Sequence, residues 1–375
     1  MGCCHTELKT MTDENSTTKE TINNTEGGGS LDAFFDPGRQ LALTIEFYFK
    51  YAVLAIGIFG TAANALVLYA LVAHHVRDAK KRAINLLIIN QNLLDLTCCL
   101  LLVISVSIQV NSHHLTGAVG YFICAIFLNN TAVYCALYGS IVNLVALTLE
   151  RYIKVVHPFW SKKHLKRWMI RAAMAFAWIA GIVAVAPPAF VGTRVDSGVC
   201  LAYFESPESK WILGSFNLLF FFFFPLIIFV YCYGRILVVM RRQMRVMAGH
   251  NVEGSAQMNA SQAQSKRIKW NNIKTMIIVS VAFNVCWLPN NTLFFIHTYF
   301  MQAGNLVVGY YPTVFLVYLN ICMNPFIYAL KHEGAKSQLT RLLVCRRTND
   351  VGDAPENSPS RAVGTHGTRT VVRHR

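Results

Sequence analysis

The sequence predicts an all-α membrane protein built as a bundle of seven transmembrane helices, and three observations support this prediction. Of the 375 residues, 54% are hydrophobic and only 14% are charged, whereas a soluble domain carries roughly a quarter charged residues. The mean hydropathy is positive, at +0.39. The apolar residues gather into seven long runs, which short polar segments separate. These runs cover residues 44–73, 83–110, 119–149, 168–191, 211–240, 272–299 and 308–330.

Each run has the roughly 20 residues that a helix needs to cross the hydrocarbon core of a bilayer. A backbone in lipid meets no water, so it satisfies its own N–H and C=O groups by forming a helix. Prolines inside these runs are tolerated, because neighbouring helices and water satisfy the carbonyls that they free. The expected domains are an extracellular, glycosylated and disordered tail over 1–43, a transmembrane domain over 44–330, a short amphipathic cytoplasmic helix over 331–345 and a disordered cytoplasmic tail over 346–375.

The distribution of Lys and Arg predicts the orientation. Most of the 34 basic residues lie in the segments 74–82, 151–171, 234–274 and 331–375, whereas 111–118 and 300–310 contain none. Because basic loops stay in the cytoplasm, the N-terminus is expected outside the cell, in a multi-pass protein of the plasma membrane. The net charge of +15 is therefore explained by topology and does not indicate a nucleic-acid partner.

Polar residues inside the predicted spans indicate function, because a carboxylate in hydrocarbon is costly. Asp95 lies in the polar stretch 90–96 of the second span, and Glu150-Arg151-Tyr152 ends the third. The sixth span contains 283–289 (FNVCWLP) and the seventh contains 320–328 (NICMNPFIY). Each motif alone is weak, since a membrane asparagine often only bonds a neighbouring helix. In this order, the set resembles the rhodopsin-like (class A) G-protein-coupled receptors over about residues 45–345.

The resemblance implies a receptor that binds an extracellular ligand, activates a heterotrimeric G protein and later meets receptor kinases and arrestin. It implies no catalytic residue and no enzyme activity. A seven-helix transporter or pump is the alternative from another class. A pump needs a continuous path of ionisable groups, and a transporter should show paired broken helices in two halves. The chain has one deep acid and no detectable internal repeat, which disfavours both.

A sodium site is implied at the centre of the bundle. Asp95, Ser140, Asn320 and Asn324 fall where the family places a sodium-binding cluster. An acid with neutral oxygen donors suits a hard cation, so sodium is the expected metal at Asp95 and acts as an allosteric modulator; no other cofactor is expected. The alternative is a hydrated polar core that holds no ion.

The resemblance also implies a set of activation switches. Arg151 is expected to be held by Glu150 until the G protein engages, and Pro158 and Phe159 are expected to contact that G protein with Arg151. Some receptors reinforce this with an acid at the foot of the sixth helix, where this chain has Lys269. The remaining switch residues are Ile141, Tyr152, Pro225, Tyr233, Phe283, Trp287, Pro289, Asn324, Pro325 and Tyr328.

Several covalent features are implied. Cys124 and Cys200 match the disulfide that joins the third helix to the second outer loop. Cys124 lies two residues further from Arg151 than is usual, so the outer third helix either starts earlier or carries a bulge. Asn15 and Asn23 are expected to be glycosylated, and Cys345 to be palmitoylated.

The ligand class follows from what the pocket lacks. No acid lies between Cys124 and Glu150, which disfavours a monoamine, and no lysine lies in 303–329, which excludes a retinal Schiff base there. Amide donors among aromatic residues suit the backbone of a peptide, so a neuropeptide is the expected ligand. A lipid or neutral small molecule is the alternative, encouraged by the phenylalanine run 220–224. The expected pocket residues are Val133, Tyr134, Asn217, Trp287, Asn290, Asn291, Phe294 and Tyr318.

Overall fold

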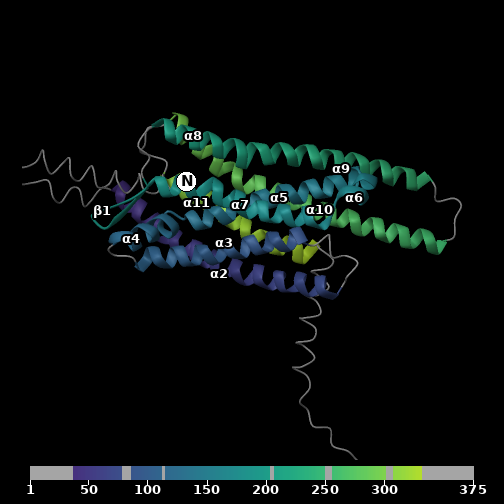
Figure 1. The fold of residues 1–375 in the computed structure, drawn as a ribbon, viewed down its shortest axis with the longest axis horizontal. Coiled ribbons are helices and arrows are strands. Elements are labelled where there is room, and N and C mark those ends of the chain that lie inside the picture. Colours follow the sequence, from purple (N-terminus) through teal and green to yellow (C-terminus); the bar gives the residue numbers. More distant parts are fainter. Residues whose placement is uncertain are drawn as a thin grey trace, which may run out of the picture. The chain divides into compact units, whose positions relative to one another are not determined.

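The computed structural model describes residues 37–77, 86–111, 115–202, 207–249, 256–300 and 307–331, which form a helical bundle with one β-hairpin (Figure 1). The long helices are α2 (Pro37–Arg77), α3 (Leu86–Asn111), α5 (Thr131–Val156), α7 (Arg167–Val191), α9 (Phe224–Gly249), α10 (Ala256–Phe300) and α11 (Val307–Lys331). The shorter elements are α4 (Gly117–Ile123), the π-helix η2 (Cys124–Leu128), α6 (Pro158–His164), β1 (Thr193–Asp196), β2 (Val199–Ala202), α8 (Pro207–Leu218) and the π-helix η3 (Leu219–Phe223).

Six segments in the described part of the chain are long and apolar enough to cross a membrane. They are Leu43–Ala73, Leu86–Gln109, Gly117–Val156, Arg167–Val191, Trp211–Gln243 and Ile273–Ile296; α11 is the seventh long helix of the bundle. Large apolar side chains cover their outer faces, and Phe176 on α7 and Val230 on α9 are 63% and 67% exposed. Such surfaces are a liability in water but are solvated by lipid. The predicted all-α membrane bundle is confirmed.

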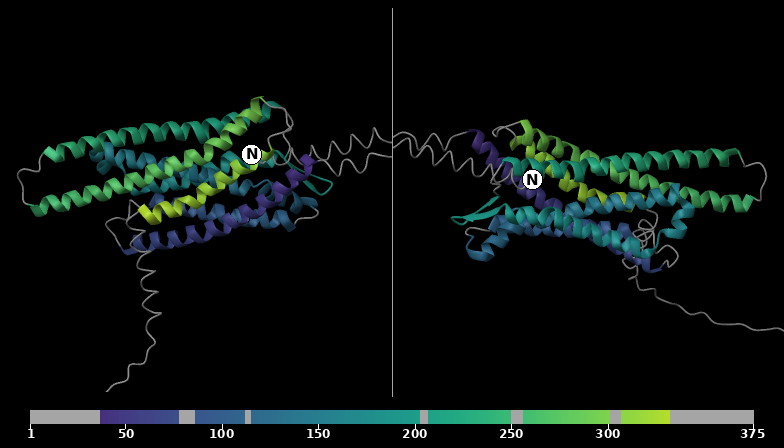
Figure 2. Two further views of the ribbon diagram at one scale, coloured as in Figure 1. Left: turned by 180° about the vertical axis from the view of Figure 1, so that it is seen from behind. Right: turned by 45° about the horizontal axis from the view of Figure 1, so that its top comes forward.

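The helix α5 lies at the centre of the packing, where it contacts α3, α7 and α9. The other large contacts join α2 to α3, α11 to α2 and α10 to α11, and the two views of Figure 2 show these helices running side by side. The approach of α7 to α5 is so close that a Cβ atom at Gly181 would lie 2.2 Å from the carbonyl oxygen of Cys135. Small residues permit such contacts between membrane helices.

The third transmembrane segment is interrupted, which explains the unusual Cys124–Arg151 spacing. The π-helix η2 is followed by Asn130, whose φ of 55° and ψ of 23° are left-handed, and α5 begins at Thr131. A π-helical turn holds more residues than an α-helical turn, and asparagine tolerates the left-handed region better than most residues. Of the two predicted alternatives, the bulge is the one that the structure shows.

A β-hairpin between α7 and α8 is held against this interrupted segment. Strands β1 and β2 pair antiparallel, with Val195 opposite Cys200, and the turn residues Ser197 and Gly198 both have positive φ, as a type I′ turn requires. The predicted disulfide between Cys124 and Cys200 is present, with a Cα–Cα distance of 5.5 Å. We call this side of the bundle the hairpin end and the opposite side, where α6 lies, the α6 end (Figure 1).

Several predicted features lie outside the described residues: Asn15, Asn23, Cys345, the amphipathic helix 331–345 and most of both tails. Tyr328 and Lys269 lie in α11 and α10, but their side chains are outside the description.

Helix α2 begins at Pro37, before the predicted start of the first span, because the apolar residues Leu41 and Leu43 continue its pattern.

Candidate functional site

The carboxylate of Asp95 lies at the centre of a buried polar cluster. Asp95 is 1% exposed and its two oxygens accept hydrogen bonds from three side chains. The Ser140 hydroxyl donates to Oδ1 over 2.8 Å, the Gln91 amide donates to Oδ1 over 3.3 Å, and the Asn324 amide donates to Oδ2 over 2.8 Å. The structure therefore brings Asp95, Ser140 and Asn324 together from α3, α5 and α11, as the sequence predicts.

A small internal cavity adjoins this cluster and has room for about one water molecule. Its polar lining is Gln91, Ser140, Asn320 and Asn324, so the fourth predicted sodium ligand, Asn320, is also placed here. Its apolar lining is Leu137, Ile141, Leu144, Val279, Phe283, Trp287 and Ile321.

The oxygen donors of this site fit a hard cation. The amide oxygens of Asn320 and Asn324 are buried and have no hydrogen-bond partner among the described residues, and buried acceptors normally have one. Together with the Asp95 carboxylate and the Ser140 hydroxyl, they form the kind of oxygen set that sodium prefers. One neighbour does not fit: the Gln91 side chain directs a donor at this set, and sequence reasoning did not identify it.

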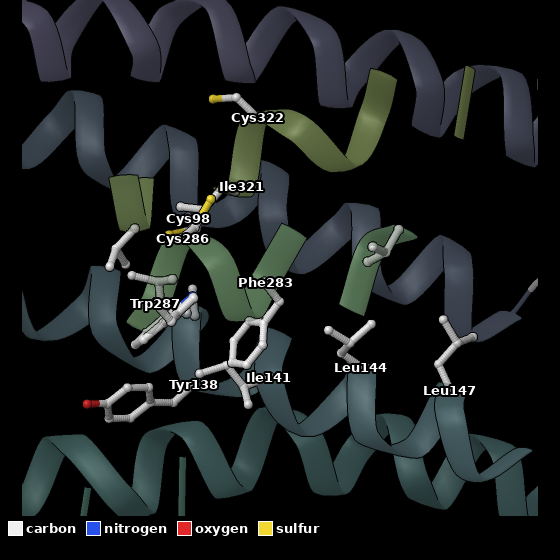
Figure 3. Packing of buried hydrophobic residues seen from close by; sticks show 14 of the residues in the cluster. Cys98, Tyr138, Ile141, Leu144, Leu147, Phe283, Cys286, Trp287, Ile321 and Cys322 are labelled. Carbon is white, nitrogen blue, oxygen red and sulfur yellow. The ribbon is translucent and has the colours of Figure 1, made fainter. Parts of the chain in front are cut away.

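The residues predicted to transmit activation lie between this cavity and α9. The rings of Phe283 and Trp287 are 5.5 Å apart, and Phe229 packs edge-on against Phe283 at 5.8 Å. Figure 3 shows the ring of Phe283 beside Ile141, with Trp287 further along the same helix. Phe283, Ile141 and Trp287 are at most 3% exposed, and Pro225 is buried on α9. This is a close-packed apolar core in which a shift of one ring requires its neighbours to move.

The predicted pocket residues lie nearer the hairpin end, on α5, α8, α10 and α11. Six of them are buried and two, Asn217 and Phe294, are half-buried. The Tyr138 hydroxyl donates to the Asn217 amide oxygen, and the Asn290 amide donates to the Thr313 hydroxyl over 3.3 Å. The remaining residues are Val133, Tyr134, Trp287, Asn291 and Tyr318, and a hydrogen bond joins the hydroxyls of Tyr134 and Tyr318.

Two of the predicted pocket residues carry a buried polar atom that lacks a hydrogen-bond partner among the described residues: the carbonyl oxygen of Asn290 and the indole nitrogen of Trp287. The two residues are three positions apart on α10 and therefore lie on one face of that helix. A buried polar atom without a partner costs about 1–3 kcal/mol. One acceptor and one donor on this face of α10 are thus without a partner among the described residues.

At the α6 end, Arg151 and Glu150 are both buried and form an ion pair, with 3.5 Å between Arg151 Nε and Glu150 Oε2. Glu150 also accepts a hydrogen bond from Lys154. Pro158 begins α6, and the Phe159 side chain that follows it is 85% exposed. An aromatic ring so exposed, on the short helix that follows α5, is suited to contact a partner.

The switch tyrosine Tyr233 joins three helices near this end. Its hydroxyl lies 3.0 Å from the Thr148 hydroxyl of α5 and accepts a hydrogen bond from Ser280 of α10 over 3.2 Å. Tyr152 instead packs its ring against His157 and Tyr231, at 5.7 and 5.9 Å. The hydroxyl of Tyr233 therefore ties α9 to both α5 and α10.

A bundle of long apolar helices, with a buried acid at its centre and a paired arginine at one end, is the architecture of a multi-pass membrane protein. The model of the family "7 transmembrane receptor (rhodopsin family)" matches residues 63–328, and the chain belongs to this family. It is a class A G-protein-coupled receptor of the plasma membrane, and members of this family are receptors rather than enzymes.

Curated relatives align with most of the chain. The Substance-K receptor of Bos taurus is 28% identical over 90% of this chain and 82% of the relative. The Somatostatin receptor type 1 of Mus musculus is 24% identical over 88% of this chain and 82% of the relative. The Substance-K receptor of Homo sapiens is 27% identical over 84% of this chain and 75% of the relative.

Proposed function

We propose that this receptor binds a neuropeptide at the hairpin end, which faces the outside of the cell, and activates a heterotrimeric G protein at the α6 end. The observation that carries the ligand class is the pair of unpartnered polar atoms on α10, the Asn290 carbonyl oxygen and the Trp287 indole nitrogen. A peptide backbone supplies both a donor and an acceptor at short spacing. The relatives named for substance K and somatostatin, which are peptides, support the same class.

The β-hairpin provides a second argument for a peptide. Its two strands pair only with each other among the described residues, and an extended peptide can add to the edge of such a strand pair by main-chain hydrogen bonds. Asp196 is exposed at the end of β1 and would attract a basic residue of the ligand. The disulfide supports the orientation, since disulfides persist in oxidising compartments.

The alternative, a lipid or neutral small molecule, rested on the phenylalanine run 220–224. In the structure Phe220, Phe223 and Phe224 are exposed on the outer face of the bundle, whereas Phe221 and Phe222 are buried. Tyr138 stacks on Phe221 with 4.2 Å between the ring centroids. The run is therefore explained by lipid contact and core packing, and it favours no lipid ligand.

The test is a neuropeptide library applied to cells that co-express this receptor and a promiscuous G protein. The expected result is nucleotide exchange in response to one peptide family, with its potency reduced about tenfold or more in Asn290→Leu. Thr292→Leu is the matched control, because Thr292 lies two residues further along α10 and is exposed. A response to lipid extracts and to no peptide would overturn the ligand class, and a response that Asn290→Leu leaves unchanged would overturn the site.

At the α6 end we propose that Arg151, Pro158 and Phe159 contact the G protein and that Glu150 holds Arg151 at rest. Phe159→Ala should lower agonist-stimulated exchange at unchanged thermal stability, because an exposed ring contributes little to folding.

Lys269, where other receptors carry a second acid, implies a loosely held resting state. Basal exchange should fall in Lys269→Glu, and equal basal exchange in wild type and variant would contradict this proposal.

The remaining proposals rest on the sequence. They are glycosylation at Asn15 and Asn23, palmitoylation at Cys345, an amphipathic cytoplasmic helix over 331–345 within the domain order given above, sodium at the Asp95 cluster when the Gln91 amide is turned away from it, and later binding of receptor kinases and arrestin. Mass spectrometry of the receptor from cell membranes tests the three modifications.

A further inference from the structure

Gln91 is a buried polar residue that the function above does not use. It lies on α3, one helical turn before Asp95, and is 1% exposed. Its amide nitrogen donates to Asp95 Oδ1 over 3.3 Å and also to the Ser140 hydroxyl oxygen. Its amide oxygen accepts a hydrogen bond from the Asn143 amide over 2.8 Å. Both ends of this buried side chain are therefore engaged.

The direction of the Gln91 amide is fixed by a relay of hydrogen bonds that begins on α7. The indole N–H of Trp178 donates to the Asn90 amide oxygen over 3.1 Å, and the Asn90 amide nitrogen donates to the Asn143 amide oxygen over 2.8 Å. The Asn143 amide nitrogen then donates to Gln91. An indole nitrogen can only donate, so each amide in the relay has one orientation that satisfies it. The last amide, that of Gln91, must point its N–H groups at the Asp95 cluster.

This orientation places a donor where a cation would need acceptors. Two of the four proposed sodium ligands, the Asp95 carboxylate and the Ser140 hydroxyl oxygen, already receive the Gln91 amide hydrogens. Those hydrogens carry partial positive charge, so they satisfy the carboxylate in place of an ion and repel an ion that approaches. A cation has to displace this amide against the whole relay before it can bind.

We propose that Gln91 controls cation binding at Asp95: its amide takes the place of the ion, and sodium binds only where this amide is removed or turned away. The inference rests on the proposed sodium site and not on the ligand or the G protein. The receptor is accordingly insensitive to sodium at physiological concentration, and its resting Asp95 cluster is stabilised by its own amide.

The experiment measures the melting temperature of the purified full-length receptor in detergent, in sodium chloride against choline chloride at equal ionic strength. Gln91→Met keeps the length of the side chain and removes the amide. Asn143 stays satisfied in this variant, because its amide nitrogen also donates to the Leu87 carbonyl over 3.0 Å. Gln109→Met is the matched control, since Gln109 lies on the same helix and bonds the Leu128 carbonyl, away from Asp95.

The expected result is no difference between the two salts for wild type and Gln109→Met, and a sodium-specific rise of about 2–4 °C for Gln91→Met. Adding Asp95→Asn to Gln91→Met should abolish that rise. A second variant, Asn143→Ala, releases the Gln91 amide oxygen so that the amide can turn, and it should also gain a sodium response if Gln91→Met does not fold. An equal rise in wild type, or no rise in either Gln91→Met or Asn143→Ala, would overturn the proposal.

The readout needs neither agonist nor G protein. If Gln91→Met gains a sodium-dependent melting temperature but no peptide activates the receptor, the inference stands and the proposed ligand class is wrong. If a peptide activates the receptor but Gln91→Met gains no sodium dependence, only the inference is wrong.

Discussion

Gly181→Ala tests a close contact between α5 and α7. The added Cβ atom would lie 2.2 Å from the Cys135 carbonyl oxygen and 2.7 Å from the Gly139 backbone nitrogen. Both atoms belong to the backbone of α5, so no side chain can rotate to make room. The helices α5 and α7 must therefore separate by about 1 Å at this point, where they form one of the most extensive contacts of the bundle.

Overpacking of this kind costs about 1–3 kcal/mol, which corresponds to a fall of about 2–12 °C in melting temperature. We therefore expect Gly181→Ala to unfold at a lower temperature than the wild-type receptor. The assay is thermal unfolding of purified receptor in detergent, followed by a fluorescent reporter of newly exposed thiols or by size-exclusion recovery after heating.

The matched control is Gly234→Ala on α9, where an added Cβ meets nothing within 4 Å. Alanine favours a helix over glycine by roughly 0.5–1 kcal/mol, so this variant should melt at or slightly above the wild-type temperature. If Gly181→Ala is as stable as Gly234→Ala, close packing between α5 and α7 at Gly181 does not contribute to stability.

Three further predictions address the rest of the bundle. Cys200→Ser removes the disulfide between positions 76 residues apart. Loop closure sets the loss of folding free energy at about 4 kcal/mol at most. Dithiothreitol should therefore lower the melting temperature of wild type but not of this variant. Glu150→Gln removes the buried negative charge that pairs with Arg151. If the resting state loses about 1 kcal/mol of stability relative to the active state, agonist-independent nucleotide exchange should rise roughly fivefold. Unchanged basal exchange would contradict the role of the pair. Tyr233→Phe removes the hydroxyl that lies between Thr148 and Ser280, and should cost about 1–3 kcal/mol in thermal unfolding, whereas no loss would show that these contacts are dispensable.

The helices were predictable because hydropathy and charge are local properties. The runs of apolar residues correspond to α2, α3, the α4–η2–α5 segment, α7, the α8–η3–α9 segment, α10 and α11, and the Cys124–Cys200 pair followed from the resemblance. The hairpin was not predicted, since strands of four residues carry little pattern. Its signal was the turn Ser197-Gly198, which suits the positive φ angles observed there.

The candidate site was predictable only in part. Asp95, Ser140, Asn320 and Asn324 were found because a family motif places them. The structure brings Ser140, Asn320 and Asn324 to one cavity, and Asp95 accepts hydrogen bonds from two of them. Gln91 was missed because its role depends on the direction of its amide. That direction is set by Trp178 on α7 and Asn143 on α5, both distant in sequence, and its only local signal is an unbroken run of three amide side chains in a membrane span.

Helix α10 is also a lever. It is 45 residues long and contains Pro289 near its hairpin end, so the arm from the proline to the start of the helix measures about 50 Å at 1.5 Å per residue. A change of roughly 10° in the bend at Pro289 moves the far end of this arm by about 9 Å. A lever that multiplies distance divides force by the same ratio. Weak contacts at the α6 end are therefore enough to hold the arm at rest, and once they are lost a small shift of Phe283 and Trp287, close to the pivot, becomes a large displacement of that end.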